Sequence, residues 1–173
     1  MPSAREMHTS HIWYKDDKPH LLIIGGRALT ESGGAMDVAF NDEIHMYDIE
    51  GEEWTEFGKT TTPMGSHCSA LFQSTGQLFV YGGTNGARFF DSILKMDLES
   101  KEWLMLSSYD GHLTGDRDFF ESPRIASMMA QADDELLVLF GGSGYEKEFN
   151  DVLAIKAEDL NNEENYANVP EIM

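Results

Sequence analysis

The stretch of residues 78–103, LFVYGGTNGARFFDSILKMDLESKEW, holds the pattern from which we predict the fold. It begins with a four-residue apolar run that ends in the glycine pair Gly82-Gly83, and it continues through Asp91 to Trp103. An apolar run of this length suits a buried β-strand and is too short for a typical helix. The alternating segment that follows Asp91 indicates a second strand. The stretch therefore predicts short strands joined by turns.

The same pattern recurs along the chain, and such repeats decide the architecture. Apolar runs end in a glycine pair three times, at Gly25-Gly26, Gly82-Gly83 and Gly141-Gly142. In the first two copies a Trp stands 12 residues after an Asp, from Asp42 to Trp54 and from Asp91 to Trp103. The third copy begins the same way around Asp151, with Ala157 where Asp48 and Asp97 stand, but has Glu163 where a Trp is due. A further strand upstream of each apolar run makes four strands per unit, named a to d.

The combination of a glycine pair, an Asp, the dipeptide Tyr47-Asp48 and a Trp six residues later resembles the kelch repeat. The resemblance covers the chain from about His8 to Ile155. It implies one four-stranded propeller blade for each unit of roughly 50 residues. It also implies that the glycine pairs, tryptophans and aspartates are structural: the glycines permit a tight turn, Trp54 and Trp103 pack between blades, and Asp42, Asp91 and Asp151 cap turns.

The expected fold is therefore all-β, with kelch-type β-propeller blades of four antiparallel strands. We expect about three blades, at approximately residues 8–57, 66–107 and 124–166, with residues 158–173 as an acidic tail or an irregular last strand. Propellers close with about four to eight blades, so three blades predict an incomplete ring. Either the remaining blades of a longer chain or self-association of identical chains would complete it.

The composition narrows the classes of partner. The chain carries 31 acidic and 12 basic residues, a formal net charge of -19. Nucleic acid and anionic membranes are then poor partners, because both require a positive surface. The single cysteine, Cys68, and the lack of an apolar leader favour a cytoplasmic protein. No set of metal ligands or phosphate-binding loop is recognisable, so we expect no cofactor and no metal.

The unequal spacing between repeats points to a binding face. The extra length lies in the b–c loop of the first unit, residues 27–41, and in the d–a loop before the third, residues 107–123. In an up-and-down blade these two kinds of loop lie at the same edge, and long loops on a rigid scaffold are where binding usually resides. Arginine and aromatic residues dominate interface hot spots. The candidate binding residues, taken from the b–c and d–a loops and their flanks on this face, are Arg27, Arg88, Arg117, Phe119, Phe120, Arg124, Tyr145 and Lys147.

The resemblance implies a protein-interaction module of the scaffold or substrate-adaptor type, which binds another protein or peptide. The alternative is a metal-dependent enzyme of the same fold, of the oxidase or specifier-protein type. The ligand sets that those enzymes require are not recognisable in the sequence, so we expect no enzyme. Phe89 and Phe90, beside a strand start, are equally compatible with packing and with binding.

Overall fold

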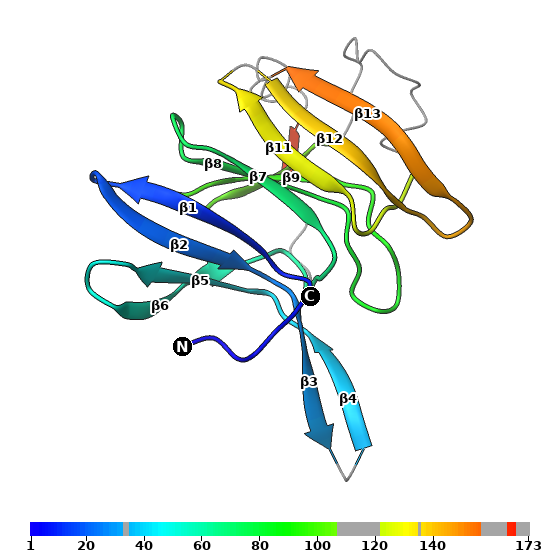
Figure 1. Ribbon diagram of the computed structural model, residues 1–173, viewed down its shortest axis with the longest axis horizontal. Helices are drawn as coiled ribbons and strands as arrows, with labels where there is room; N and C mark the ends of the chain where they lie inside the picture. Colours follow the sequence, from blue (N-terminus) through cyan, green and yellow to red (C-terminus); the bar gives the residue numbers. More distant parts are fainter. Residues whose placement is uncertain (33–34, 107–121, 135, 157–165, 169–173) are drawn as a thin grey trace.

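The computed structural model describes residues 1–32, 35–106, 122–134, 136–156 and 166–168 of the chain. All regular structure within these residues is β-strand, arranged as three antiparallel sheets and one separate hairpin. Figure 1 shows the three sheets side by side, as in consecutive propeller blades. The described sheets do not close a ring. The prediction of an all-β, incomplete propeller of about three blades is confirmed.

Blade one has the strand order β1-β2-β5-β6, which are its strands a to d. The hairpin β3-β4 is inserted between strands b and c, and it extends away from the sheet (Figure 1). The predicted insertion at residues 27–41 is thus a structured hairpin. The strand bounds are β1 Thr9–Lys15, β2 Lys18–Ile24, β3 Arg27–Ser32, β4 Ala35–Phe40, β5 Glu43–Asp48 and β6 Glu53–Lys59.

Blade two contains residues 78–103, and its strands a to d are β7 to β10. A fifth strand, β14, pairs antiparallel with β10, so a short C-terminal segment joins the outer edge of this blade. The strand bounds are β7 Cys68–Phe72, β8 Gln77–Tyr81, β9 Ile93–Asp97, β10 Trp103–Leu106 and β14 Tyr166–Asn168.

Blade three has three described strands in the order β11-β12-β13. Their bounds are Met128–Asp133, Leu136–Ser143 and Glu148–Lys156. The sheet register corrects the sequence alignment of the repeats by one position: Lys156, and not Ala157, stands where Asp48 and Asp97 stand. The cross-strand partners of Lys156, Asp48 and Asp97 show this, because they occupy equivalent places in strand b: Leu136, His20 and Gln77.

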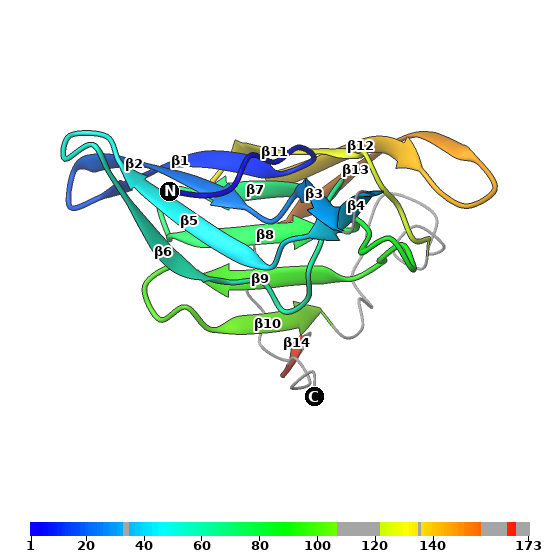
Figure 2. The same cartoon turned by 90° about the horizontal axis from the view of Figure 1, so that it is seen from below.

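The hydrophobic core lies in the two seams between blades. In Figure 2 the innermost strands β1, β7 and β11 lie along one side of the molecule, and β10 and β14 lie at the opposite side. The seam between blades one and two buries one cluster of side chains, and the seam between blades two and three buries another. Trp103 packs against the first cluster and donates a hydrogen bond from Nε1 to the carbonyl of Lys59 at 2.8 Å. Its predicted place between blades is confirmed.

The glycine pairs turn the chain where strand b ends. Gly25 and Gly26 have φ angles of 58° and 95°, a region that side chains other than glycine rarely adopt. A Cβ atom on Gly26 would also lie 2.8 Å from the carbonyl oxygen of Glu6. The pair therefore combines a left-handed turn with close approach to the segment that precedes strand a.

The aspartates that cap turns differ from those expected. Asp48 accepts hydrogen bonds from the backbone N–H groups of Glu50 and Gly51 at 3.0 Å, and Asp97 caps the equivalent turn of blade two. These N–H bonds hold the pKa of Asp48 below its usual value. The prediction that Asp42 and Asp151 cap turns is wrong. Their carboxylates form ion pairs instead, Asp42 with Lys59 and Asp151 with Arg124.

Candidate functional site

The b–c loops and the d–a linkers meet at one edge of the blades. The N–H of Gly26 donates to the carbonyl of Met64 at 2.7 Å, and the N–H of Gly83 donates to Arg124 at the same distance. Within the described residues this joins the two kinds of loop, as their spacing predicts. We call this the loop edge. It comprises residues 25–32, 35–42, 60–67, 82–92, 122–127 and 141–150.

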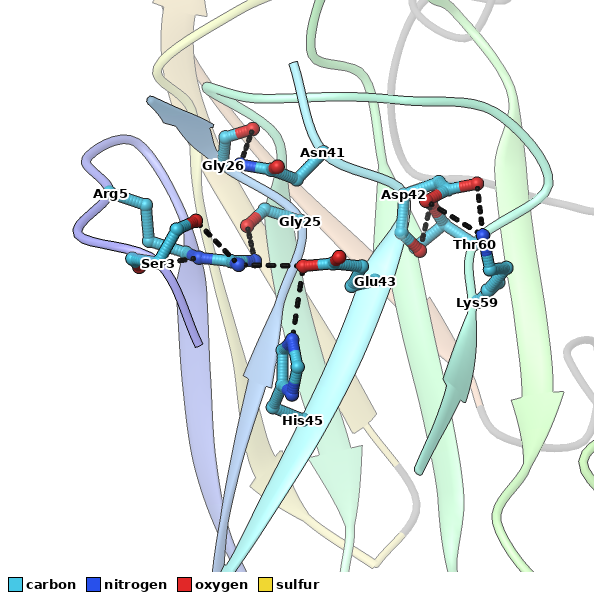
Figure 3. A network of polar contacts seen from close by, with 10 residues as sticks. All are labelled: Ser3, Arg5, Gly25, Gly26, Asn41, Asp42, Glu43, His45, Lys59 and Thr60. Carbon is cyan, nitrogen blue, oxygen red and sulfur yellow. Dashed lines mark hydrogen bonds and ion pairs between the residues drawn. The ribbon is translucent and has the colours of Figure 1, made fainter. Parts of the chain in front are cut away.

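Blade one carries a buried arginine clamp at the loop edge. The guanidinium of Arg5 donates to the carbonyl of Gly25 at 3.1 Å and to the carboxylate of Glu43 at 2.7 Å (Figure 3). His45 contacts the same carboxylate at 3.0 Å. The hydrogen bond from Arg5, followed by that from His45, lowers the pKa of Glu43. The clamp fixes the segment before strand a to the start of strand c.

Blade three repeats this clamp with Arg124. Its guanidinium makes two hydrogen bonds to Asp151, at 2.7 and 2.9 Å, and a third to the carbonyl of Gly141. The guanidinium also lies over the ring of Phe149, 3.4 Å from its centroid. The hydrogen bond from Arg124 lowers the pKa of Asp151. Arg124 is only 1% exposed, so the prediction that it belongs to the binding surface is wrong.

Blade two lacks this clamp. Ser92 in blade two is equivalent to Glu43 in blade one and Asp151 in blade three. In each blade this residue comes directly before the strand c residue that pairs with the residue preceding the glycine pair. Met64 likewise is equivalent to Arg5 and Arg124. Each of the three comes one residue before an isolated antiparallel bridge that precedes strand a. A methionine and a serine thus replace a buried ion pair.

A cavity of about 200 Å³ lies at this altered position. Its wall is mainly apolar, and the side chain of Arg88 adds a cation beside Phe90, 5.3 Å from the ring centroid. Arg88 is exposed, so it can contact a molecule at the mouth of the cavity. The lining residues are Thr61, Thr62, Met64, Val80, Gly82, Arg88, Phe90, Ser92, Leu94 and Met105.

The hairpin β3-β4 presents an exposed apolar pair. Leu29 and Val38 are cross-strand partners, and they are 63% and 42% exposed. Arg27, at the base of the hairpin, forms an ion pair with Glu6 at 2.7 Å. The predicted cation Arg27 is thus engaged within the chain, while the two aliphatic side chains are open to a partner.

The loop of blade three reaches the loop of blade two. The ring of Tyr145 stacks on Phe89 with centroids 4.4 Å apart, and its hydroxyl accepts a hydrogen bond from the N–H of Phe89. Lys147 lies 5.0 Å from the ring of Phe149. The structure therefore brings Arg88, Tyr145 and Lys147 to the same edge. The other predicted residues, Arg117, Phe119 and Phe120, lie outside the described residues.

Sequence reasoning missed the cavity and the aliphatic pair. The cavity had a signal in the sequence: Met64 and Ser92 break a pattern of arginine and acid that two other repeats keep. That signal is readable only with the correct register of the third repeat. The pair Leu29 and Val38 had no clear signal, because exposed aliphatic residues in a strand cannot be told from core residues by type alone.

The described residues contain no group of three or more His, Cys, Asp and Glu side chains placed to hold a metal ion. No helix among them is long and apolar enough to cross a membrane.

Comparison with known proteins gives a family match over nearly the whole chain. The family model described as the KLHDC2/KLHL20/DRC7 Kelch-repeats domain matches residues 7–169.

The similar curated proteins are longer than this chain. Kelch domain-containing protein 10 of Xenopus tropicalis is 27% identical over 88 residues, which cover 47% of this chain and 21% of that protein. The human protein of the same name is 28% identical over 88 residues, 47% of this chain and 20% of that protein. Acyl-CoA-binding domain-containing protein 5 of Arabidopsis thaliana is 30% identical over 86 residues, 48% of this chain and 12% of that protein. The matched segment therefore spans about a fifth or less of each relative.

Proposed function

The chain belongs to the kelch-repeat family, and from this premise we propose that it binds a segment of a partner protein at the loop edge. Membership supports a protein-interaction module in general, and the names of the kelch relatives describe a repeat domain and not a catalytic activity. The finer proposal is a scaffold or substrate adaptor in which the cavity of blade two anchors the partner.

The cavity carries this proposal. In blade two, Met64 and Ser92 replace the buried ion pair of the other blades, and a mainly apolar cavity lies at this position on the edge of the sheet. Hollows of this kind, with few polar groups, are the usual sites for anchoring side chains. The exposed cation of Arg88 stands beside it. The matching ligand is an apolar side chain that enters the cavity next to a carboxylate that pairs with Arg88.

Neighbouring residues extend the same surface. Tyr145 is 64% exposed and stacks on Phe89, so it presents an ordered aromatic ring beside the cavity loop. Rigid aromatic rings supply contact area with little loss of conformational entropy. The aliphatic pair Leu29 and Val38 offers a second apolar contact on blade one. A partner segment that follows the loop edge can meet all three.

A peptide-display selection tests this function without a known partner. A phage-displayed library of random peptides is selected on the purified chain, and the affinities of the enriched peptides are measured by isothermal titration. We expect peptides that share an apolar residue beside Asp or Glu. Ser92→Phe, which fills the cavity, and Arg88→Glu, which reverses its cation, should each weaken them at least tenfold, about 1.4 kcal/mol.

Matched controls lie at the opposite edge of the blades. Ser74→Phe adds the same ring in the β7–β8 turn, and Lys18→Glu reverses an exposed cation in the β1–β2 hairpin. Neither should change the affinity. Peptides that bind the Ser92→Phe and Arg88→Glu chains as tightly as the wild type would contradict the proposal.

A further inference from the structure

The two faces of blade two are buried by its neighbours. On the face toward blade one, four apolar side chains form a row across all four strands, which we call the rear row: Leu71, Leu78, Met96 and Trp103. On the face toward blade three, a forward row is formed by Cys68, Tyr81 and Ile93. Every repeat therefore offers one apolar row to the blade before it and another to the blade after it.

Blade three has a forward row that no described residue covers. The register places Met128, Phe140 and Val152 opposite one another, at the positions of the forward row of blade two. These three side chains are 69%, 50% and 61% exposed, whereas Cys68, Tyr81 and Ile93 are at most 3% exposed. The same repeat position is thus buried in the middle of the arc and open at its end.

Blade one has the complementary open face. Its rear row is made by residues at the positions of the rear row of blade two: Ile12, Leu21, Tyr47 and Trp54. Ile12 is 45% exposed and the other three are partly exposed, and Tyr47 and Trp54 stack on each other with centroids 4.9 Å apart. One end of the arc therefore presents a forward row, and the other end presents a rear row.

We infer that a second copy of this chain covers both open faces. The chain already pairs a forward row with a rear row twice, at its two internal seams, so the open rows are the two halves of an interface that this sequence makes. Two copies joined head to tail contribute six blades, a number at which propellers close. Heterologous contacts of this kind form rings when the rotation closes.

Charge modulates this pairing but does not prevent it. The rows themselves contain no Asp, Glu, Lys or Arg, but Lys156 lies on the forward face of blade three and Glu56 on the rear face of blade one. Each copy carries a net charge of -19, which repels the other at long range. Salt screens such repulsion, so the dimer should become tighter as ionic strength rises. This inference is independent of the proposed binding function, because the open rows lie on the blade faces and the cavity lies at the loop edge.

Sedimentation equilibrium of the full chain tests the inference. The wild-type chain of 19.4 kDa should sediment as a species of twice that mass. Val152→Glu on the forward row, or Ile12→Glu on the rear row, should raise the dissociation constant at least tenfold. Met128→Glu provides a second variant of the forward row. Leu29→Glu is the control, since it places the same charge on an exposed aliphatic residue of the hairpin and should leave the dimer unchanged.

Mixing separates a pair in which forward rows meet rear rows from a pair in which like rows meet. A mixture of the Val152→Glu and Ile12→Glu chains keeps one intact forward row and one intact rear row, so it should form mixed dimers more readily than either variant alone. Far-UV circular dichroism checks that each variant keeps its strands. A wild-type monomer at the highest soluble concentration, or a dimer that Ile12→Glu leaves intact, would overturn the inference.

Discussion

The middle blade and the two end blades are built from one repeat but differ in two ways. Blade two has both apolar rows packed against its neighbours, while blade three leaves its forward row exposed and blade one leaves its rear row partly exposed. Blades one and three keep an arginine clamp, while blade two replaces it with Met64 and Ser92. A repeat therefore forms its strands locally, whereas the burial of its faces depends on a neighbouring blade. Where one repeat lacks the ion pair of the other repeats, as at Met64 and Ser92, the same position can form a cavity.

Removing the acid of a clamp should have the largest effect. Asp151→Ser leaves the buried guanidinium of Arg124 without its carboxylate, which should cost about 3–5 kcal/mol of unfolding free energy. The double variant Arg124→Met and Asp151→Ser recreates the pair found in blade two and should recover part of that loss. Urea denaturation measures both. If the double variant were less stable than Asp151→Ser alone, the two clamps and the cavity would not be equivalent positions.

The rear rows should differ in their response to truncation. Leu78→Ala, at a fully buried position of blade two, should lower the unfolding free energy by about 2–5 kcal/mol. The equivalent Leu21→Ala in blade one should cost less than about 1 kcal/mol when Val152→Glu keeps the chain monomeric, because the row is then open. Equal losses in urea denaturation would mean that position in the arc does not decide burial.

The two seams should respond differently to acid. His67 and His11, between the inner strands of blades one and two, have pKa values lowered to about 4 by burial. An unfolded histidine titrates near 6.5, so their stabilisation is complete above that pH and is lost as the pH falls toward 4. The effect should be roughly 1–3 kcal/mol per histidine. Ser127, which stands at the position of His67 in the other seam, does not titrate.

Hydrogen exchange at pH 7 and pH 5 measures this difference. Amides of β1 should lose protection at pH 5 before those of β11. The variant His67→Gln retains a polar side chain toward Thr9, 2.9 Å from the imidazole in the wild type, and should reduce the pH dependence to the part that His11 contributes. An unchanged pH profile in this variant would show that His67 does not carry the effect.

The two repeat tryptophans should show the smallest difference. Trp103→Phe removes the hydrogen bond to Lys59 across the first seam and should cost about 1 kcal/mol. Trp54→Phe keeps an aromatic ring on Tyr47 and should cost less than about 0.5 kcal/mol in the monomeric background. Thermal unfolding followed by fluorescence compares them. A larger loss of unfolding free energy from Trp54→Phe than from Trp103→Phe would show that Trp54 is buried against another part of the protein.

The sequence predicted what depends on local pattern. Glycine pairs, short apolar runs and the step from Asp to Trp were sufficient for the blades, because each strand carries its own alternation and each turn its own residues. The insertion at residues 27–41 was located by spacing alone. The clamps were not predicted, because Arg5 and Glu43 lie 38 residues apart and meet only through the sheet register. Arg124 was misplaced on the surface for the same reason, since its burial depends on pairing with Asp151.

The most direct test of the account compares two adjacent methionines on opposite faces of strand β11. Met129 is buried in the second seam, and Met128 belongs to the open forward row of blade three. Hydrogen peroxide oxidises methionines according to their exposure, and peptide mass spectrometry follows each rate. In the wild-type chain Met128 should oxidise as slowly as Met129, because a second copy covers it, and in Val152→Glu it should oxidise much faster while Met129 stays protected. Fast oxidation of Met128 in both chains would show that no second copy covers the forward row of blade three.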